Sequence, residues 1–304
     1  MLGITREIKT MRHKTNRAIV FFCLLLLLTG CKQNTSHSDL AFPGMSPDSV
    51  ERCAQDSLFT NTQYSRHLLR QALSGTSDSL SYYRLLSFYS KSYFVTADFD
   101  SILYYNQFIK RFCDKVTPSP EVHDLLSTVY NIEGNVLMQR TQPDSAIISY
   151  EKAYKERLQG KEPDYLPDLC INLADANVHK GDYTYAAYYY RRALFLCDSL
   201  GLPDRNKFPV YYGLGQTYME LRDFELSNHY YELAGAFFDR MSVSEKWTYL
   251  NNRGNHFYYK KDYPQAVCYI SRALDVVESY PQMVFEQNLC KANLGELYAV
   301  SYTH

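Results

Sequence analysis

Few side chains in this sequence are placed to do chemistry. The eight histidines are scattered, and none lies at metal-ligand spacing from a second histidine. The sequence contains no H-E-x-x-H zinc motif, no G-x-S-x-G nucleophile elbow, no phosphate-binding Walker loop and no G-x-G-x-x-G dinucleotide motif. It therefore predicts a protein that is not an enzyme and that holds no metal ion and no cofactor.

Carboxylates recur close to expected helix starts, where they have a structural use. An aspartate at the N-cap accepts a hydrogen bond from a backbone N–H of the first turn, so we expect caps rather than acid–base groups. The residues concerned are Asp100, Asp144, Asp182, Asp223 and Asp262. We likewise expect His179 and His256 to be satisfied or solvated side chains rather than ligands.

Cys31 is the residue whose surroundings indicate covalent chemistry. Five basic residues precede an apolar run over residues 18–28, which ends in Leu28-Thr29-Gly30-Cys31. A basic head, an apolar core and small residues at the cleavage site make up a secretory signal. The run of 11 residues is shorter than the roughly 20 that a transmembrane helix needs. The pattern resembles a bacterial lipoprotein signal, which implies that residues 1–30 are removed and that Cys31 is lipidated.

Such an anchor implies a location. Residues 31–47 are rich in Ser, Thr, Asn, Gly and Pro, the composition of a flexible tether. A lipid-anchored protein that faces the periplasm or the cell surface is therefore expected. Lys32 follows the cysteine where an acid would indicate retention in the inner membrane, and this favours the outer membrane by analogy with enteric bacteria.

The net charge of the chain argues against one class of partner. Residues 1–30 carry five basic side chains and one acidic one, so their removal takes the formal net charge from −1 to about −5. Nucleic-acid binding, which needs a basic stripe, is not indicated.

The six cysteines after Cys31 include no C-x-x-C pair, and we expect them to be small buried apolar residues rather than disulfides.

An internal repeat organises the rest of the chain. A small residue within an apolar helical pattern recurs at intervals of 40, 41, 39 and 41 residues. These small residues are Gly134, Ala174, Gly215, Gly254 and Gly295. The first four are followed by similar segments, each with a small residue, then Tyr or Ile four positions on, then Ala three further. They span residues 143–153, 181–193, 222–234 and 261–273.

This pattern resembles the tetratricopeptide repeat, in which a first helix carries Leu-Gly and Tyr and a second carries Ala, Tyr and Ala. The best match consists of Tyr211, Leu214, Gly215, Tyr218, Ser227, Tyr231 and Ala234. The resemblance implies an all-α, right-handed superhelical solenoid of helix-turn-helix repeats. The period of about 40 residues is longer than the family's 34 and also suits HEAT and armadillo repeats, but the small and aromatic positions favour the tetratricopeptide interpretation.

The repeat also sets the expected domain boundaries. Residues 48–115 are interpreted as an N-terminal helical cap and a degenerate repeat, because terminal repeats are atypical. Residues 116–304 are interpreted as an array of four full repeats plus the first helix of a fifth. No second helix follows Gly295, and residues 300–304 are similar to one translated frame of a transposon end used in sequencing libraries. We therefore expect a fragment of a longer protein.

The residue after the small position of each first helix faces the concave groove in this family. Here each of those residues is an amide or an acid, and two further amides lie one turn earlier. The predicted partner contacts are Asn131, Asn135, Asp175, Gln216, Asn251, Asn255 and Glu296. An amide both donates and accepts, so such a row can hold the backbone of an extended peptide. A solvated polar face explains the same residues without any partner.

Three functions are consistent with these patterns. The first is a membrane-anchored scaffold that binds a protein or peptide on its concave face. The second is the sensory region of a longer transmembrane regulator with a histidine kinase or helix-turn-helix output, similar to repeat lipoproteins of gut Bacteroidetes. The third is a glycan-capturing lipoprotein of an uptake system, although the usual motifs of that family after the cysteine are not visible.

Overall fold

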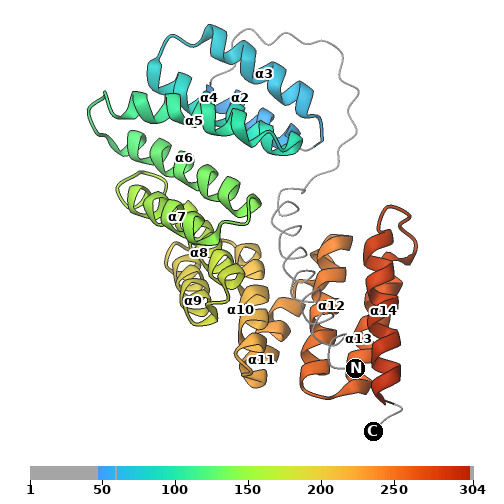
Figure 1. The fold of residues 1–304 in the computed structure, drawn as a ribbon. Helices are drawn as coiled ribbons and strands as arrows, with labels where there is room; N and C mark the ends of the chain where they lie inside the picture. The colour runs from blue at the N-terminus through green and yellow to red at the C-terminus, as the bar shows by residue number, and fades with distance from the viewer. Residues whose placement is uncertain (1–46, 59, 302–304) are drawn as a thin grey trace. The chain divides into compact units, whose positions relative to one another are not determined.

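The computed structural model describes residues 47–58 and 60–301, and its regular elements are all helical (Figure 1). The chain divides into two compact units, whose described parts are residues 47–180 and 181–301. The predicted signal peptide, Cys31 and the tether as far as residue 46 lie outside the described residues, as do residues 302–304. The anchor therefore stays a prediction.

The first unit consists of helices joined by short turns. The α-helices are α2 (Pro47–Ser57), α3 (Thr62–Gly75), α4 (Ser79–Lys91), α5 (Phe99–Cys113), α6 (Pro120–Gln139), α7 (Pro143–Arg157) and α8 (Leu166–Lys180). Short 3-10 helices lie at Ser92–Thr96 and Pro163–Tyr165. Helices α2 to α5 occupy the segment interpreted as a cap and a degenerate repeat. Helices α6 and α7 form the most extensive contact of this unit.

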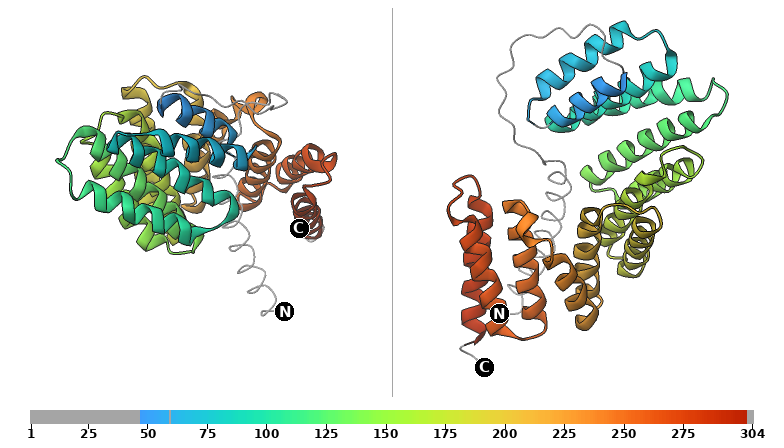
Figure 2. Two further views of the ribbon diagram at one scale, coloured as in Figure 1. Left: turned by 90° about the horizontal axis from the view of Figure 1, so that it is seen from above. Right: turned by 180° about the vertical axis from the view of Figure 1, so that it is seen from behind.

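The second unit repeats the same arrangement. Its α-helices are α9 (Tyr183–Ser199), α10 (Phe208–Glu220), α11 (Phe224–Gly235), α12 (Val243–Tyr259), α13 (Tyr263–Glu278) and α14 (Val284–Ser301), with 3-10 helices at Asp204–Lys207 and Phe238–Arg240. Helices α12, α13 and α14 lie side by side in every view (Figure 2). The expectation of an all-α fold built from helix pairs with a period of about 40 residues is confirmed.

The turns that join the two helices of a repeat share one backbone feature. Ala97, Arg222 and Lys261 have positive φ angles of 51°, 64° and 65°, which reverse the chain before the next helix. The aspartate that follows each of them caps that helix: Asp98, Asp223 and Asp262 accept a hydrogen bond from the backbone N–H three residues on.

The expected caps are correct for Asp182, Asp223 and Asp262 but wrong for the other two. Asp182 accepts from the backbone N–H of Tyr185. Asp100 lies inside the first turn of α5, whose cap is Asp98, and pairs with Arg140 instead. Asp144 lies in the first turn of α7 and pairs with Lys180. Asp98 and Asp100 both suit the positive end of α5, so sequence alone does not separate them, whereas at α7 the N-cap is Gln142 and no side chain caps the helix.

Close packing leaves no room for a side chain at two of the glycines on the first helices. A Cβ built at Gly134 would lie 2.4 Å from the ring of Tyr150, and one at Gly215 would lie 2.9 Å from the ring of Tyr231. The large side chain comes in each case from the second helix, 16 residues further along. Both tyrosines are buried. We call this contact the glycine notch, and it explains the small residue that the repeat pattern requires.

The described cysteines have no disulfide partner. None of the six forms a disulfide with another; four are buried in agreement with the expected apolar role, whereas Cys53 and Cys268 are exposed and depart from it. Burial is the main cause that raises the pKa of Cys113 to about 12 and that of Cys290 to about 11. The thiols of Cys113 and Cys290 are therefore protonated and unreactive at neutral pH.

Candidate functional site

The seven predicted partner contacts all lie on first helices, and the structure separates them by exposure. We call them the amide row: Asn131, Asn135 and Asp175 in the unit 47–180, and Gln216, Asn251, Asn255 and Glu296 in the unit 181–301. Three of them are buried, with exposed fractions of 8% for Asp175, 1% for Asn251 and 5% for Asn255. The other four are half-buried.

In the unit 47–180, two half-buried amides have one oxygen fixed and the amino group available. The Oδ1 of Asn131 on α6 accepts a hydrogen bond of 2.8 Å from the Nδ2 of Asn172 on α8. The Oδ1 of Asn135 accepts one of 2.7 Å from the hydroxyl of Tyr150. Each bond orients the amide and uses an acceptor, so the Nδ2 donors are left for a ligand.

The ring that holds Asn135 is the one that fills the glycine notch of the same helix. Tyr150 is 2% exposed, and burial, assisted by the negative charge of Asp175, raises its pKa well above the ordinary value. The hydroxyl therefore stays protonated and remains a donor to Asn135 at neutral pH. Packing in the notch and orientation of the amide are thus coupled through one side chain.

In the unit 181–301, members of the row connect first helices to one another. The Oδ1 of Asn251 on α12 accepts a hydrogen bond of 3.2 Å from the Nδ2 of Asn293 on α14. The hydroxyl of Tyr258 on α12 donates to the Oε1 of Glu296 on α14 at 2.8 Å. Asn252 donates similarly to the hydroxyl of Tyr212 on α10. Part of the row therefore contributes to the stacking of repeats.

The sequence pattern did not reveal these helix-to-helix bonds. Their partners Asn172, Asn252 and Asn293 each lie three residues before a member of the row, so they recur with the repeat and could have been found. Placement on a helix face does not say which amide meets a neighbouring helix, because that depends on the distance between helices. Whether the row binds a partner stays a prediction.

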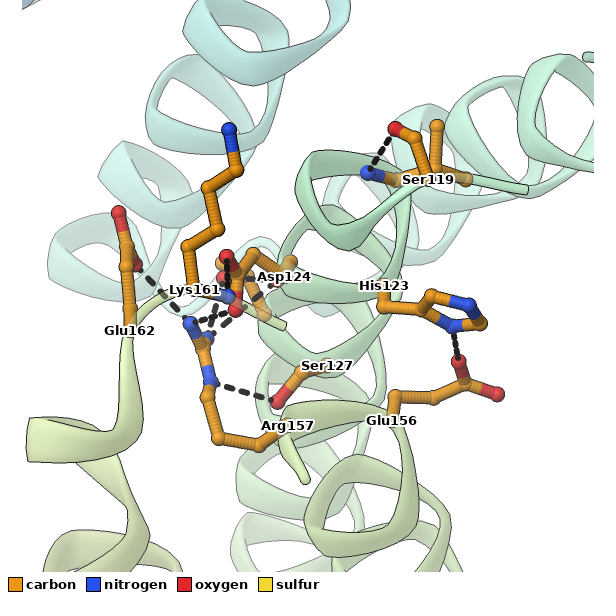
Figure 3. Close-up of polar contacts among 10 residues, drawn as sticks. Ser119, His123, Asp124, Ser127, Glu156, Arg157, Lys161 and Glu162 are labelled. Carbon is orange, nitrogen blue, oxygen red and sulfur yellow. Dashed lines mark hydrogen bonds and ion pairs between the residues drawn. The ribbon is translucent and has the colours of Figure 1, made fainter. Parts of the chain in front are cut away.

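A buried ionic cluster in the unit 47–180 was not expected from the sequence (Figure 3). Arg157 at the end of α7 is 5% exposed, and its Nη1 lies 2.8 Å from Asp124 Oδ1 and 2.9 Å from Glu162 Oε2. The backbone N–H of Lys161 donates to the other carboxylate oxygen of Asp124 at 2.7 Å. A Cβ at Gly160 would meet that carboxylate at 1.8 Å, so the loop approaches closely because glycine is present.

This cluster fixes the loop between α7 and α8. The guanidinium also donates through Nε to Ser127 at 3.2 Å and through Nη2 to Thr128 at 3.2 Å. On the neighbouring turn, His123 Nδ1 and Glu156 Oε2 are 2.7 Å apart. A buried charge whose donors are all engaged in this way is typical of a structural pair rather than of a reacting group. Sequence reasoning missed the cluster because Asp124 and Arg157 are 33 residues apart.

A second polar cluster lies in the core of the unit 181–301. His256 is fully buried, and its Nδ1 is 2.8 Å from the Oγ of Ser227, which donates to the carbonyl of Gly215. Its Nε2 has no hydrogen-bond partner, nor do the hydroxyl of Tyr231 and the Nε of Arg253. Burial, with the charges of Arg253 and Lys260, lowers the pKa of His256 to about 4. The imidazole is therefore neutral at physiological pH.

The described residues offer little else for chemistry. No group of three His, Cys, Asp or Glu side chains within residues 47–58 and 60–301 could hold a metal ion. Over the same residues, no helix has the length and apolar character needed to cross a membrane.

Comparisons with known proteins agree with the helix-pair architecture. Residues 208–234, which cover α10 and most of α11, match the tetratricopeptide repeat family. No curated protein matches the sequence significantly.

Several solved structures have a similar fold. The apo form of the quorum sensor NprR from B. thuringiensis matches with a TM-score of 0.61 at 15% identity, over 82% of this chain and 70% of that one. PilF from Pseudomonas aeruginosa matches with a TM-score of 0.56 at 16% identity, over 81% and 96% of the two chains. The apo form of RapI matches with a TM-score of 0.67 at 12% identity, over 84% and 72%. At these identities the likeness shows the fold alone; with the repeat match, it supports a tetratricopeptide-repeat protein.

Proposed function

We propose that this protein is a membrane-anchored scaffold that binds an extended segment of a partner protein on its first helices. The observation that carries the proposal is the availability of Asn131 and Asn135, whose oxygens are fixed by neighbouring side chains while their Nδ2 groups remain. Fixed amides lose little conformational entropy on binding, so they are suited to hold a ligand.

The chemistry of these groups favours a peptide backbone as the ligand. Carbonyl oxygens recur along an extended chain, and each Nδ2 group can donate to one of them without reading the side chains. In the unit 181–301, Gln216 offers a half-buried amide of the same kind, whereas the half-buried carboxylate of Glu296 accepts hydrogen bonds and suits a backbone N–H of the ligand. We assign the buried members Asp175, Asn251 and Asn255 to the positioning of helices. We assign direct contact with the partner to the four half-buried members.

The experiment is to select peptides and then remove the amides. A phage-displayed library of random peptides is panned against the full chain in detergent, and the dissociation constants of the enriched peptides are measured by calorimetry. We expect Asn131→Ala with Asn135→Ala, both in the unit 47–180, to weaken binding by about 1–3 kcal/mol, the worth of two or three hydrogen bonds. Asn255 is unsuitable as a test position because its side chain is buried, at 5% exposed.

A matched control tests whether the loss of any exposed amide lowers the affinity for the peptide. Gln107 is an exposed amide on α5, a second helix, and Gln107→Ala should leave the affinity unchanged. All variants should unfold cooperatively, and those with Asn135→Ala should unfold a few degrees lower because the buried Tyr150 hydroxyl loses its acceptor. Enriched peptides that bind the double variant as tightly as the original chain would show that the amide row is only solvated surface.

A second candidate, a sensory region of a longer regulator, is favoured by one observation. A solved structure of similar fold is described as that of a quorum sensor. In this alternative the ligand bound on the first helices controls an output module, a kinase or a helix-turn-helix domain, encoded further along the gene. Sequencing the genomic locus beyond the codon for Tyr298 distinguishes the two, because only a sensor requires an output domain in the same reading frame.

A further inference from the structure

Helices α4 and α5, in the segment interpreted as a cap and a degenerate repeat, keep the register of the other repeats. Ser90 on α4 is 0% exposed, and its Oγ lies 3.2 Å from the Oδ1 of Asn106 on α5, 16 residues further along. Gly134 and Tyr150 have the same spacing and are also in contact. Ser90 therefore has the small position of its repeat, and Asn106 has the place of the tyrosine in the glycine notch.

The backbone gives a second, independent sign of this register. In five repeats, a residue with positive φ lies seven positions after the small residue. These residues are Ala97, Thr141, Gly181, Arg222 and Lys261, which follow Ser90, Gly134, Ala174, Gly215 and Gly254. The residue directly after Ser90 is Lys91, which thus corresponds to Asn135 on α6. The register of the amide row extends to α4, where it holds a lysine.

The charge of Lys91 has no direct partner among residues 47–58 and 60–301. The side chain is half-buried, and no carboxylate of this part of the chain lies within ion-pair distance of its Nζ. Burial lowers the pKa of Lys91, and the charges of Asp168 on α8 and Glu51 on α2 oppose this shift. Glu51 is already paired with Arg84 at 2.9 Å. Lys91 and Asp168 are therefore near enough to attract each other but do not form an ion pair.

Asp168 is the complementary group on α8. Its side chain is exposed, and neither a hydrogen bond nor an ion pair to another described residue holds it. Desolvation by the surrounding protein raises the pKa of Asp168 to about 6, while the charge of Lys91 opposes the shift. A side chain that is open to solvent and also surrounded by protein lies in a concave part of the surface. At pH 7 the carboxylate is mostly ionised and accessible to a ligand.

Helix α6 lies between the two charges (Figure 1). Its Asn131 accepts a hydrogen bond from Asn172 on α8, so α6 and α8 are neighbours on this side of the unit. The first helices thus present a cation on α4, the amide donors of Asn131 and Asn135 on α6, and a carboxylate on α8. Packed helix axes are about 8–10 Å apart and an extended chain rises about 3.3 Å per residue, so about three to six residues span the two charges.

We propose that the partner segment carries an acidic and a basic side chain about three to six residues apart, of which the acid pairs with Lys91 and the base with Asp168. This inference rests on the proposed function, because the amides of α6 hold the backbone between the two charges. It adds a chemical class, an extended segment of mixed charge whose acidic side lies towards α4. A segment with two like charges places one of them beside a like charge and is disfavoured.

Synthetic peptides with defined charges test the proposal. Each is acetylated, amidated and fluorescently labelled, and consists of Ser, Thr and Gln with one Glu and one Lys whose spacing varies across the set. Binding to the full chain in detergent is followed by anisotropy at low ionic strength. We expect the best of these peptides to bind about three- to tenfold more tightly than a neutral peptide with Gln at both charged positions. Added salt should reduce this gain.

Double-mutant cycles assign each peptide charge to its partner. Lys91→Met should remove the gain that comes from the peptide's Glu and keep the gain from its Lys, and Asp168→Asn should do the reverse. Neither residue forms an ion pair, so the unfolding transition should not change. Lys155→Met and Glu151→Gln are the matched controls, because both residues are exposed on α7, a second helix, and neither should alter the affinity.

The neutral peptide separates this inference from the proposed function. Asn131→Ala with Asn135→Ala should weaken its binding, whereas Lys91→Met should not. If the amide variant loses binding but charged and neutral peptides bind the original chain equally well, the inference is overturned and the proposed function stands. A gain that depends equally on Lys155 or Glu151 also overturns it, because general charge attraction then explains the result. If no peptide binds, both fail.

Discussion

Replacing the notch glycines with alanine should have opposite effects at two equivalent positions. At Gly134 the new methyl group would lie 2.4 Å from the Tyr150 ring, about 1 Å inside an ordinary contact. The ring cannot rotate away freely because it is buried and its hydroxyl donates to Asn135. At Gly295 the same methyl group meets no atom within 4 Å.

The magnitudes follow from two competing effects. Alanine in place of glycine inside a helix stabilises by up to about 1 kcal/mol at both positions. Overpacking of a rigid core contact costs about 1–3 kcal/mol, and only Gly134→Ala has this cost. We therefore expect Gly134→Ala to be destabilised by about 1–2 kcal/mol and Gly295→Ala to be stabilised by about 0.5–1 kcal/mol.

The assay is urea unfolding followed by far-UV circular dichroism. Tyr150→Leu in the Gly134→Ala background supplies the control, because a flexible side chain should accommodate the methyl group and recover part of the loss. The packing argument is refuted if Gly134→Ala is as stable as the original chain or if Gly295→Ala is the less stable of the two.

Three further predictions test other parts of the structure. Arg157→Leu should destabilise the chain by about 3–5 kcal/mol in urea unfolding, because it leaves the carboxylate of Asp124 buried without its partner; a loss below about 1 kcal/mol would contradict this. His256 has a folded pKa of about 4 and an unfolded value near 6.5, so the unfolded state binds the proton first and stability falls as pH is lowered. Between pH 7 and pH 5 this group should cost about 2 kcal/mol, and His256→Asn should reduce the pH dependence by that amount. Cys31→Ser should release the protein from membranes in a flotation assay, and continued membrane association would disprove the lipid anchor.

The helices and their order could be predicted because a single feature, a small residue recurring about every 40 positions, carries the packing of the array. Gly134, Gly215 and Gly254 each contact a large residue at a constant distance along the chain, so the contact is encoded locally. Which aspartate caps a helix is harder to predict. Asp98 immediately precedes α5 and Asp100 lies in its first turn, and only the backbone conformation of the turn determines which of the two accepts the capping hydrogen bond.

The parts that could not be predicted depend on distances between helices. Asp124 and Arg157 stand on different helices, and nothing in their local sequence indicates that the two charges meet. Asn135 and Asn255 have the same place in the repeat, yet the first is half-buried and the second is 5% exposed. A repeat pattern gives the face of a helix, whereas exposure on that face is set by the neighbouring side chains.

This difference bears on how the amide row can serve two purposes. Asn251 accepts from Asn293 on the next first helix and is 1% exposed, whereas Asn131 accepts from Asn172 on the next first helix and is half-buried. An amide whose oxygen is held by its own repeat, as Asn135 is by Tyr150, stays half-buried and keeps its donors. Asn131 and Asn251 have the same place in the repeat and the same kind of partner, so exposure rather than the origin of the hydrogen-bond partner separates the amides whose donors can reach a ligand. Because Tyr150 also fills the notch at Gly134, the orientation of Asn135 and the binding proposed there are coupled to the packing of its own repeat.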